Sequence, residues 1–186
     1  MIGNIVRTSP NAITFTIKGV VNISGVANAL RRTLTNDITA WAAHRVEFHV
    51  NTSCQPDEYI AHRIGLVPLS CAEAAEFEVD VCGKDLTCSA VFGEQAPNDA
   101  TIMQMNADQR VKCKVFVEAG HGRTHARFNV VAGAGYDIDG DSANFGFETI
   151  NGSDPVGVLR QALEELILRV QRVAAIIRAE SAAPNL

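Results

Sequence analysis

The chain has 186 residues, 47% hydrophobic and 20% charged, a composition that excludes a disordered chain and indicates one ordinary globular domain or two small ones. Its 16 basic and 21 acidic residues give a net charge of −5, which argues against a protein that grips nucleic acid over its own surface. The five cysteines form no Cys-x-x-Cys pair, and neither a signal peptide nor an apolar run of about 18 residues occurs. We therefore expect no disulfide framework, a reducing compartment and no contact with a membrane.

The first 52 residues predict a strand, a helix and a second strand. Hydrophobic and polar residues alternate over 12–21, as in a half-buried strand, and again over 44–52. Between these strands the period changes to that of a helix, for which Ser24 is the expected N-terminal cap. The apolar stripe of this helix consists of Val26, Leu30 and Leu34, and its flank carries Arg31 and Arg32.

The middle of the chain, from about residue 70 to residue 147, predicts a mostly β region. Alternating hydrophobic residues indicate strands in "EFEVDVC", "RVKCKVFVEA" and "HARFNVV". Two stretches between them, "FGEQAPND" and "AGAGYDIDGDSANFG", have the glycine and acidic residues typical of turns.

The last segment predicts a helix of about 25 residues, with Asp154 as its cap and Pro155 in its first turn. Such a helix is about 37 Å long, which is more than the short strands of this chain can cover. We expect one face to pack on the chain's own sheet and a second face to pack on another subunit. The apolar seam recurs at spacings of 4, 3, 4, 3 and 4 and consists of Leu159, Leu163, Leu166, Val170, Val173 and Ile177.

Two groups of polar residues raise the question of metal chemistry. His121 and His125 have a spacing at which two imidazoles can bind one metal ion, but the glycines around them favour a turn that enters a strand. The stretch "DIDGDSANFGFE" has the acidic positions of an EF-hand loop without its central glycine or its entering helix, so we interpret it as a polar loop. None of the cysteines has a histidine within a few residues to activate it as a nucleophile.

A third group, "DEYIAHRIGLVPLS" at residues 57–70, leaves two interpretations open. In a helix, Glu58 and His62 would lie one turn apart on one face and could act as an acid–base pair. The alternative, which we favour, is an ion-paired helix with acids in its first turn and bases in its last, whose exposed charge serves a partner. The residues that carry this charge are Asp57, Glu58, His62 and Arg63.

Four blocks of the sequence resemble the alpha-like subunits of multisubunit RNA polymerases, a family that has archaeal members and includes the third-largest subunit of eukaryotic polymerase II. They are, in order, "NALRRTL", "NTSCQPDEYIAHRIGLVPL", "GHGRTHARF" and "FGFETINGSDPVGVLRQAL", and together they span nearly the whole chain. The resemblance implies an α+β fold with a dimerisation domain of two helices on a sheet, residues 1–51 and 145–186. An inserted, mostly β domain, residues 52–144, would interrupt it.

The resemblance also implies a function. Members of this family catalyse no reaction; they pair with a smaller alpha-like subunit, and the pair docks the second-largest catalytic subunit in support of transcription. The implied heterodimer interface consists of Val26, Leu30, Leu34, Leu159, Leu163, Leu166, Val170, Val173 and Ile177. The implied docking residues for the large subunit are Arg31, Arg32, Asp57, Glu58, His62 and Arg63. Other polymerase subunits are further expected partners, and sequence-specific contact with DNA is not expected.

The chain lacks the residues of two metal sites that some members of the family contain. Eukaryotic members often carry a zinc loop after the Pro-Leu pair, where this chain has "SCAEAAEFEVDVC" with Cys71 and Cys82 alone, and it has no room for the iron–sulfur insertion of some archaeal members. We therefore expect no metal and no other cofactor. A compact polymerase, such as a viral one, would account for this, with the chain in the nucleus, the cytoplasm or a virion according to its source.

Two alternatives to the polymerase subunit stay open. One is a metal- or thiol-dependent enzyme that uses His121, His125 and a cysteine. The other is a homodimeric helical adaptor built on the C-terminal seam, which would leave the central blocks without a role.

Overall fold

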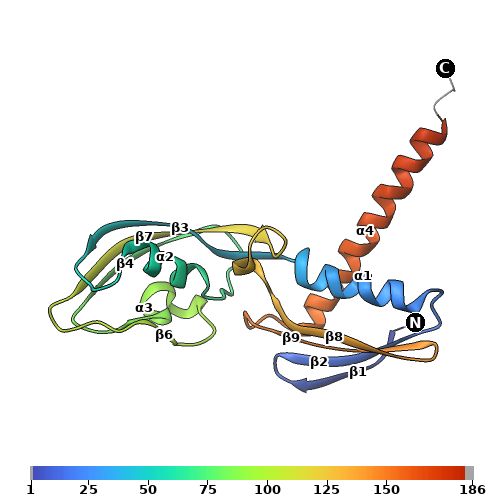
Figure 1. Cartoon of the computed structure of the whole chain (residues 1–186), viewed down its shortest axis with the longest axis horizontal. Helices are drawn as coiled ribbons and strands as arrows, with labels where there is room; N and C mark the ends of the chain where they lie inside the picture. Colours follow the sequence, from blue (N-terminus) through green and yellow to red (C-terminus); the bar gives the residue numbers. More distant parts are fainter. Residues whose placement is uncertain (1, 183–186) are drawn as a thin grey trace. The chain divides into compact units, whose positions relative to one another are not determined.

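The computed structural model describes residues 2–182, with side chains as far as Ala179, and confirms a mixed α+β chain with antiparallel sheets (Figure 1). The helices are α1 (Ile23–Asn36), α2 (Asp57–Gly65), α3 (Cys88–Phe92) and α4 (Pro155–Ala182). The strands are β1 (Ile2–Ser9), β2 (Ala12–Lys18), β3 (Thr39–Asn51), β4 (Ala75–Cys82), β5 (Leu86–Thr87), β6 (Thr101–Met103), β7 (Arg110–His121), β8 (Val131–Asp139) and β9 (Ser142–Thr149). Two short 3-10 turns are η1 (Gly93–Gln95) and η2 (Ala126–Phe128). No helix among the described residues has both the length and the apolar composition to cross a membrane.

The elements pack into two compact units. The first unit consists of Met1–Ile38, Val131–Thr149 and Asp154–Leu186, and the second of Thr39–Val130 and Ile150–Ser153. These boundaries differ from the expected division after residues 51 and 144. Strand β3 belongs to the second unit because it pairs with β7 along its whole length, and β8 belongs to the first because it pairs with β9. That the second unit is an inserted domain stays a prediction.

In the first unit, α1 and α4 lie against one face of a four-stranded antiparallel sheet with the order β1-β2-β9-β8 (Figure 1). The predicted alternation in β2 is confirmed, since Ile13, Phe15 and Ile17 are buried and the residues between them are more exposed. Phe15 pairs in register with Phe145 of β9, and their rings stack with 5.2 Å between centroids. Burial of this apolar face under two helices allows the opposite face of the sheet to remain polar.

The start of α1 differs from the prediction, because Asn22 and not Ser24 caps the helix. Asn22 has a left-handed backbone with a φ of 57°, which asparagine tolerates better than most residues. Its side-chain Oδ1 accepts a hydrogen bond from Gly25 N at 3.2 Å, so Ser24 lies within the first turn. A Cβ at position 25 would lie 2.6 Å from Asn22 Nδ2, so the glycine makes room for the cap.

The glycine-rich stretch before residue 147 is a second difference, because it forms the β8–β9 hairpin and not a turn region. Gly140, with a φ of 54°, makes the turn between the two strands. The Phe145 ring of β9 stacks on the rings of Phe15 of β2 and Tyr136 of β8. This packing holds the segment as two strands although its sequence has a weak propensity for strands. The acidic positions that match an EF-hand therefore lie on a hairpin. The strand expected in "HARFNVV" is also wrong, because Ala126–Phe128 form η2 and only the last residue, Val131, belongs to a strand.

Helix α4 begins as predicted. Pro155 is its first residue, and Asp154 Oδ2 accepts a hydrogen bond from Gly157 N at 2.8 Å. This bond, together with the pairing of Asp154 with Arg7 of β1, lowers the pKa of the Asp154 carboxyl. The helix runs for 28 residues, and near its middle Arg169 pairs with Asp37, the C-terminal cap of α1.

Replacing Arg169 by Met should lower the free energy of unfolding of the first unit by about 2 kcal/mol, because a buried carboxylate would lose this cation. The Asp37 side chain is 6% exposed, so water has little access to replace the guanidinium. Urea unfolding of the isolated chain measures the change. The double variant Asp37→Asn/Arg169→Met should recover most of the loss; a double variant as unstable as Arg169→Met would mean that Arg169 acts through packing alone.

In the second unit, a three-stranded antiparallel sheet with the order β3-β7-β4 packs its inner face against α2 and α3. The predicted alternation in β7 is confirmed, and its buried residues are Val111, Cys113, Val115 and Val117. Ile60 and Ile64 of α2 complete this core. The strand expected over 44–52 is the second half of β3, which begins at Thr39 because its alanine-rich first half also pairs with β7.

Candidate subunit interface

The nine residues predicted for the heterodimer interface fall into three groups by exposure. Three of them are buried inside the first unit, between 1% and 3% exposed: Leu30, Leu34 and Leu159. Three are partly exposed: Val26, Leu163 and Leu166. Three are 57% to 63% exposed: Val170, Val173 and Ile177. The seam thus begins in the chain's own core and continues onto its surface, and its contact with a partner stays a prediction.

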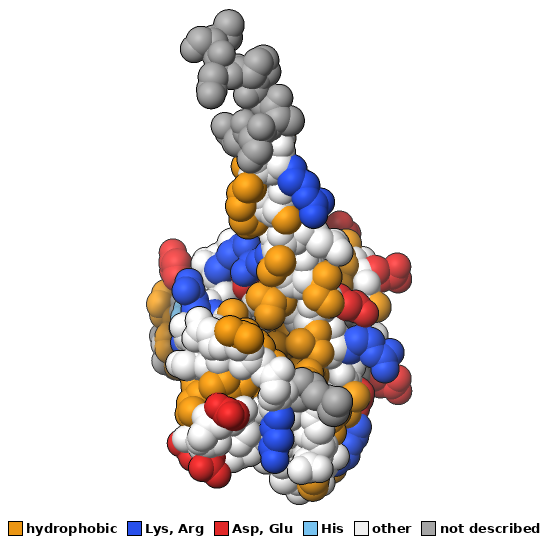
Figure 2. Space-filling model, turned by 90° about the vertical axis from the view of Figure 1, so that its right-hand side faces the viewer, with side chains coloured by type: hydrophobic (Ala, Val, Ile, Leu, Met, Phe, Trp, Pro, Cys, Tyr) orange, Lys and Arg blue, Asp and Glu red, His pale blue; other side chains and the backbone are white. Residues whose placement is uncertain are grey.

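The second half of α4 presents an apolar surface (Figure 2). Helix α1 has 14 residues and is about 21 Å long, so it can cover only half of the 28-residue α4, which is about 42 Å long. Figure 2 shows hydrophobic side chains along α4 toward its C-terminal end. We call these residues the α4 surface: Ile167, Leu168, Val170, Val173, Ile176 and Ile177. Three of them, Ile167, Leu168 and Ile176, were missing from the predicted set because they lie off the strict heptad seam.

The six residues predicted to dock a large subunit are divided between the two units. Arg31 and Arg32 lie on α1 in the first unit, where Arg31 Nη2 donates a hydrogen bond to Asn28 Oδ1 at 3.0 Å. The other four, all exposed, lie on α2 in the second unit: Asp57, Glu58, His62 and Arg63. Each unit therefore carries its own part of the predicted docking set.

Helix α2 has its acids in the first turn and its bases in the last, which is the predicted order of charges, but no ion pair joins these acids to these bases among the described residues. Ile60 and Ile64 are fully buried, which fixes the helix on the sheet and leaves its charged side in solvent. Asp57 Oδ1 accepts a hydrogen bond from Asn51 Nδ2 at 2.7 Å. Within the described residues, Glu58 and His62 share neither a hydrogen bond nor an ion pair, so the acid–base interpretation gains no support.

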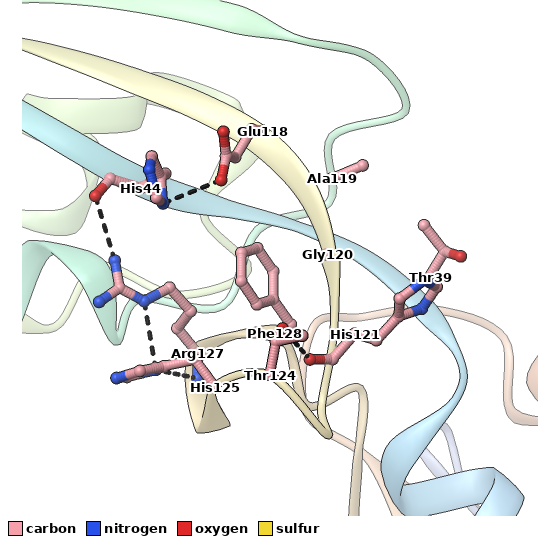
Figure 3. A pocket seen from close by; sticks show the side chains of 10 residues that line it. All are labelled: Thr39, His44, Glu118, Ala119, Gly120, His121, Thr124, His125, Arg127 and Phe128. Atoms are coloured by element: carbon pink, nitrogen blue, oxygen red, sulfur yellow. Dashed lines mark hydrogen bonds and ion pairs between the residues drawn. The ribbon is translucent and has the colours of Figure 1, made fainter.

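His121 and His125 line a cavity of about 480 Å³ in the second unit, together with His44 and Glu118 (Figure 3). His44 Nδ1 lies 2.9 Å from Glu118 Oε1. His125 Nδ1 accepts hydrogen bonds from Arg127 N at 3.1 Å and from Arg127 Nε at 3.2 Å, so its lone pair is directed at Arg127 and not at a metal site. His121 Nδ1 is buried and has no hydrogen-bond partner among the described residues.

The contacts around this cavity serve the fold. Arg127 Nη1 donates to the Ala43 carbonyl at 2.9 Å and so ties η2 to β3. Phe128 packs on Gly120, where a Cβ would lie 2.6 Å from the ring. No cysteine is among the described residues that line the cavity, and the described part of the chain holds no group of three or more side chains suited to a metal ion. The geometry of the histidines therefore gives the enzyme alternative no support.

The five cysteines are free thiols, and burial makes three of them poor nucleophiles. Burial raises the pKa of Cys113 to about 11, and the nearby charges of Asp57 and Glu78 add to the shift. Burial also raises the pKa of Cys71 and of Cys88. Because the thiolate is the reactive form, these thiols are suited to a core and not to covalent catalysis.

The Cys113 thiol should make the second unit less stable at high pH. A thiol in the unfolded chain has a pKa of about 8.5, so it loses its proton at a pH at which the folded Cys113 still keeps its own. The free energy of unfolding should therefore fall between about pH 9 and about pH 11, by up to about 3 kcal/mol. Urea unfolding across this range measures the slope, and Cys113→Ala should flatten it. An unchanged slope in that variant would assign the loss to other groups.

Comparison with known proteins relates the chain to RNA polymerase subunits. It is 28% identical over 144 residues to DNA-directed RNA polymerase subunit Rpo3 of Pyrococcus horikoshii, a match that covers 67% of this chain and 54% of that protein. The match to DNA-directed RNA polymerase subunit Rpo3 of Methanocaldococcus jannaschii is 26% identical over 161 residues and covers 82% of this chain and 83% of that protein. The match to DNA-directed RNA polymerase II subunit rpb3 of Dictyostelium discoideum is 26% identical over 151 residues and covers 61% and 50%. No family model matches the chain.

The chain spans about half the length of two of these relatives and most of the third. Each match covers at least 61% of the chain, which is more than either compact unit contains, so the similarity extends over both units. The printed names of these relatives are those of RNA polymerase subunits, the family that the four sequence blocks resemble. The chain is therefore a homologue of the Rpo3 and rpb3 subunits of DNA-directed RNA polymerases.

Proposed function

We propose that the chain is a non-catalytic subunit of a DNA-directed RNA polymerase, which pairs with a smaller alpha-like subunit and docks the second-largest catalytic subunit. The observation that carries this proposal is the α4 surface, on a chain whose relatives are polymerase subunits. An exposed apolar surface of this kind suits a permanent subunit interface, which resembles a domain core cut in half. The protein would then act inside the cell, within the multisubunit polymerase that carries out transcription.

Each unit has its own part in this proposal. The first unit is the dimerisation domain, and the small partner covers the exposed half of α4. The second unit is the inserted domain, and its helix α2 presents charge to the large subunit. Arginine suits such a docking surface because its planar guanidinium forms paired hydrogen bonds with carboxylates. The proposed docking residues are Arg31, Arg32, Asp57, Glu58, His62 and Arg63.

Co-expression tests the proposal. The tagged chain is produced alone, with the small alpha-like subunit of the same genome, and with that subunit and the second-largest subunit together. We expect self-association or poor solubility alone, a 1:1 complex with the small subunit, and a ternary complex with both, measured by size-exclusion chromatography with light scattering. A stable monomer that binds neither subunit would refute the proposal. A stable homodimer that ignores both would favour the helical adaptor.

A further inference from the structure

A groove between α2 and β6 lies beside the proposed docking residues but is formed mostly by side chains that the sequence did not single out. It belongs entirely to the second unit and has a volume of about 490 Å³. Its lining residues come from the loop before α2, from α2 itself, and from β6 with the residue after it, and they include Cys54, Tyr59, Arg63, Thr101 and Gln104.

The charge of this groove comes from Arg63, since none of its described lining residues is acidic. Arg63 Nη1 donates a hydrogen bond to Tyr59 Oη at 3.2 Å, and Nη2 donates to the Thr101 carbonyl at 3.3 Å. These bonds use two of the five N–H donors of the guanidinium and leave three for a ligand. Because both α2 and β6 hold the guanidinium, it loses little further freedom when it binds a carboxylate.

Strand β6 has one main-chain edge at the groove that pairs with no other strand among the described residues. It pairs with β5 on one side and forms a sheet of two strands in the described chain. The Ala100 carbonyl accepts a hydrogen bond from Cys88 N at 2.9 Å, on the side of β5 and α3. Successive carbonyls of an extended chain point in opposite directions, so the Thr101 carbonyl points toward Arg63 and the groove. An edge of this kind can accept an additional extended segment.

Tyr59 provides the aromatic part of the groove. Its side chain is 42% exposed although it lies on a helix whose other face is buried. The guanidinium carbon of Arg63 lies 5.7 Å from the centroid of the Tyr59 ring, a cation–π contact that holds the two side chains next to each other. Tyrosine and arginine are enriched among the residues that contribute most to binding at protein interfaces.

We propose that this groove seats an extended segment of the polymerase's second-largest subunit, with a carboxylate side chain of that segment on Arg63. This inference rests on the proposed function, which assigns the large subunit to α2. Charge complementarity selects an acidic segment, because the described lining residues of the groove include Arg63, which keeps unused N–H donors, and no acidic residue. The groove also continues the exposed charged side of α2, so one partner can occupy both surfaces.

Cys54 reports whether the groove is occupied. Cys54 is an exposed thiol at the groove, and Cys82, which is also exposed, lies at the end of β4 and not among the groove residues. In the ternary complex, alkylation by N-ethylmaleimide should slow at least about 10-fold at Cys54 relative to the complex with the small subunit alone, and not at Cys82, because the rate depends on access. Mass spectrometry of the digested complex quantifies each thiol. Unchanged Cys54 reactivity in a complete ternary complex, or equal slowing at Cys54 and Cys82, overturns the inference. Failure to form the ternary complex counts instead against the proposed function.

Two variants and a matched control test the charge and the shape of the groove. Arg63→Gln removes the cation, and Gln104→Trp fills the groove while leaving Arg63 and its partners in place; each should reduce capture of the large subunit about 10-fold. Lys84→Gln removes one exposed charge elsewhere on the same unit and should change nothing. Continued lack of reaction at the buried Cys113 shows that the second unit is still folded in each variant. Full capture by both variants, or equal loss in Lys84→Gln, contradicts the inference.

A benzophenone maleimide on Cys54 identifies the occupant in the ternary complex. We expect a cross-link to a segment of the large subunit that contains Asp or Glu. Changing that acidic residue to Arg should restore capture by the Arg63→Glu variant, which alone should bind weakly. A cross-link to a second copy of the chain, to the small subunit, or to a segment without an acidic residue would overturn the proposed occupant.

Discussion

Replacing Val173 by Asp should abolish pairing with the small alpha-like subunit while the chain itself stays folded. Val173 is 57% exposed in the isolated chain, so a carboxylate at this position remains in water and costs the fold little. In the proposed pair the same carboxylate would be buried in an apolar seam without a cation, which costs several kcal/mol. A cost of about 4 kcal/mol corresponds to about 1000-fold weaker binding.

The matched control for this experiment is Gln171→Asp, which places the same charge two residues earlier, roughly opposite Val173 and off the heptad seam. Gln171 lies next to Ile167 and Leu168 of the α4 surface, so we expect Gln171→Asp to lower the affinity less than Val173→Asp does. Titration of the purified small subunit into each variant measures the affinity, and circular dichroism measures the fold of the free chain. Equal affinity of Val173→Asp and the unchanged chain would show that the seam is not the interface. Leu163→Asp and Leu166→Asp should also abolish pairing, but both positions are partly buried in the chain, so their loss would combine folding with binding.

The Leu34→Ala variant should destabilise the isolated chain by about 3 kcal/mol, although the family resemblance places Leu34 in the heterodimer interface. Leu34 lies on α1 and is 1% exposed, because the chain's own sheet and α4 already cover that helix. Removing the side chain of a buried leucine costs about 2–5 kcal/mol, since the surrounding atoms fill the cavity only in part. Urea unfolding followed by circular dichroism measures the loss.

The control for Leu34→Ala is Val173→Ala, which should change the stability of the isolated chain by less than about 0.5 kcal/mol because Val173 is exposed there. For the affinity of the small subunit we expect the opposite order: Val173→Ala should lower it more than Leu34→Ala, because Val173 itself would contact the partner. Unchanged stability of the Leu34→Ala chain would mean that α1 does not pack on its own sheet in solution, and that Leu34 is open to a partner.

Elements with one buried and one exposed face could be predicted from the sequence. The alternation of β2 and of β7, and the start of α4 at Pro155 with its Asp154 cap, follow from local rules that link a side chain to its direction from the backbone. The four blocks that resemble RNA polymerase subunits could also be recognised from the sequence, because each consists of residues in a fixed order along the chain. The relatives found by comparison confirm that resemblance.

Elements whose conformation depends on distant contacts could not be predicted. The β8–β9 hairpin contains glycines and acids that favour turns, yet pairing with β2 and stacking of Phe145 on Phe15 hold it as two strands. The cap of α1 is Asn22 and not the predicted Ser24, because Gly25 leaves space for the asparagine side chain. The groove at Arg63 joins α2 to β6, 38 residues further along the chain, and no periodic pattern links two such segments.

By itself, the sequence determined that α4 is a long helix with an apolar seam, that α2 carries exposed charge, and that the chain resembles a polymerase subunit. Only the tertiary structure decided which part of the seam is available to a partner. Hydrophobic periodicity shows that a side chain avoids water, but it does not show which surface covers that side chain. Helix α1 is capped at its C-terminal end by Asp37, which pairs with Arg169 of α4. Leu159 lies before Arg169 along α4 and is buried, and Val170 and Val173 lie after it and are exposed.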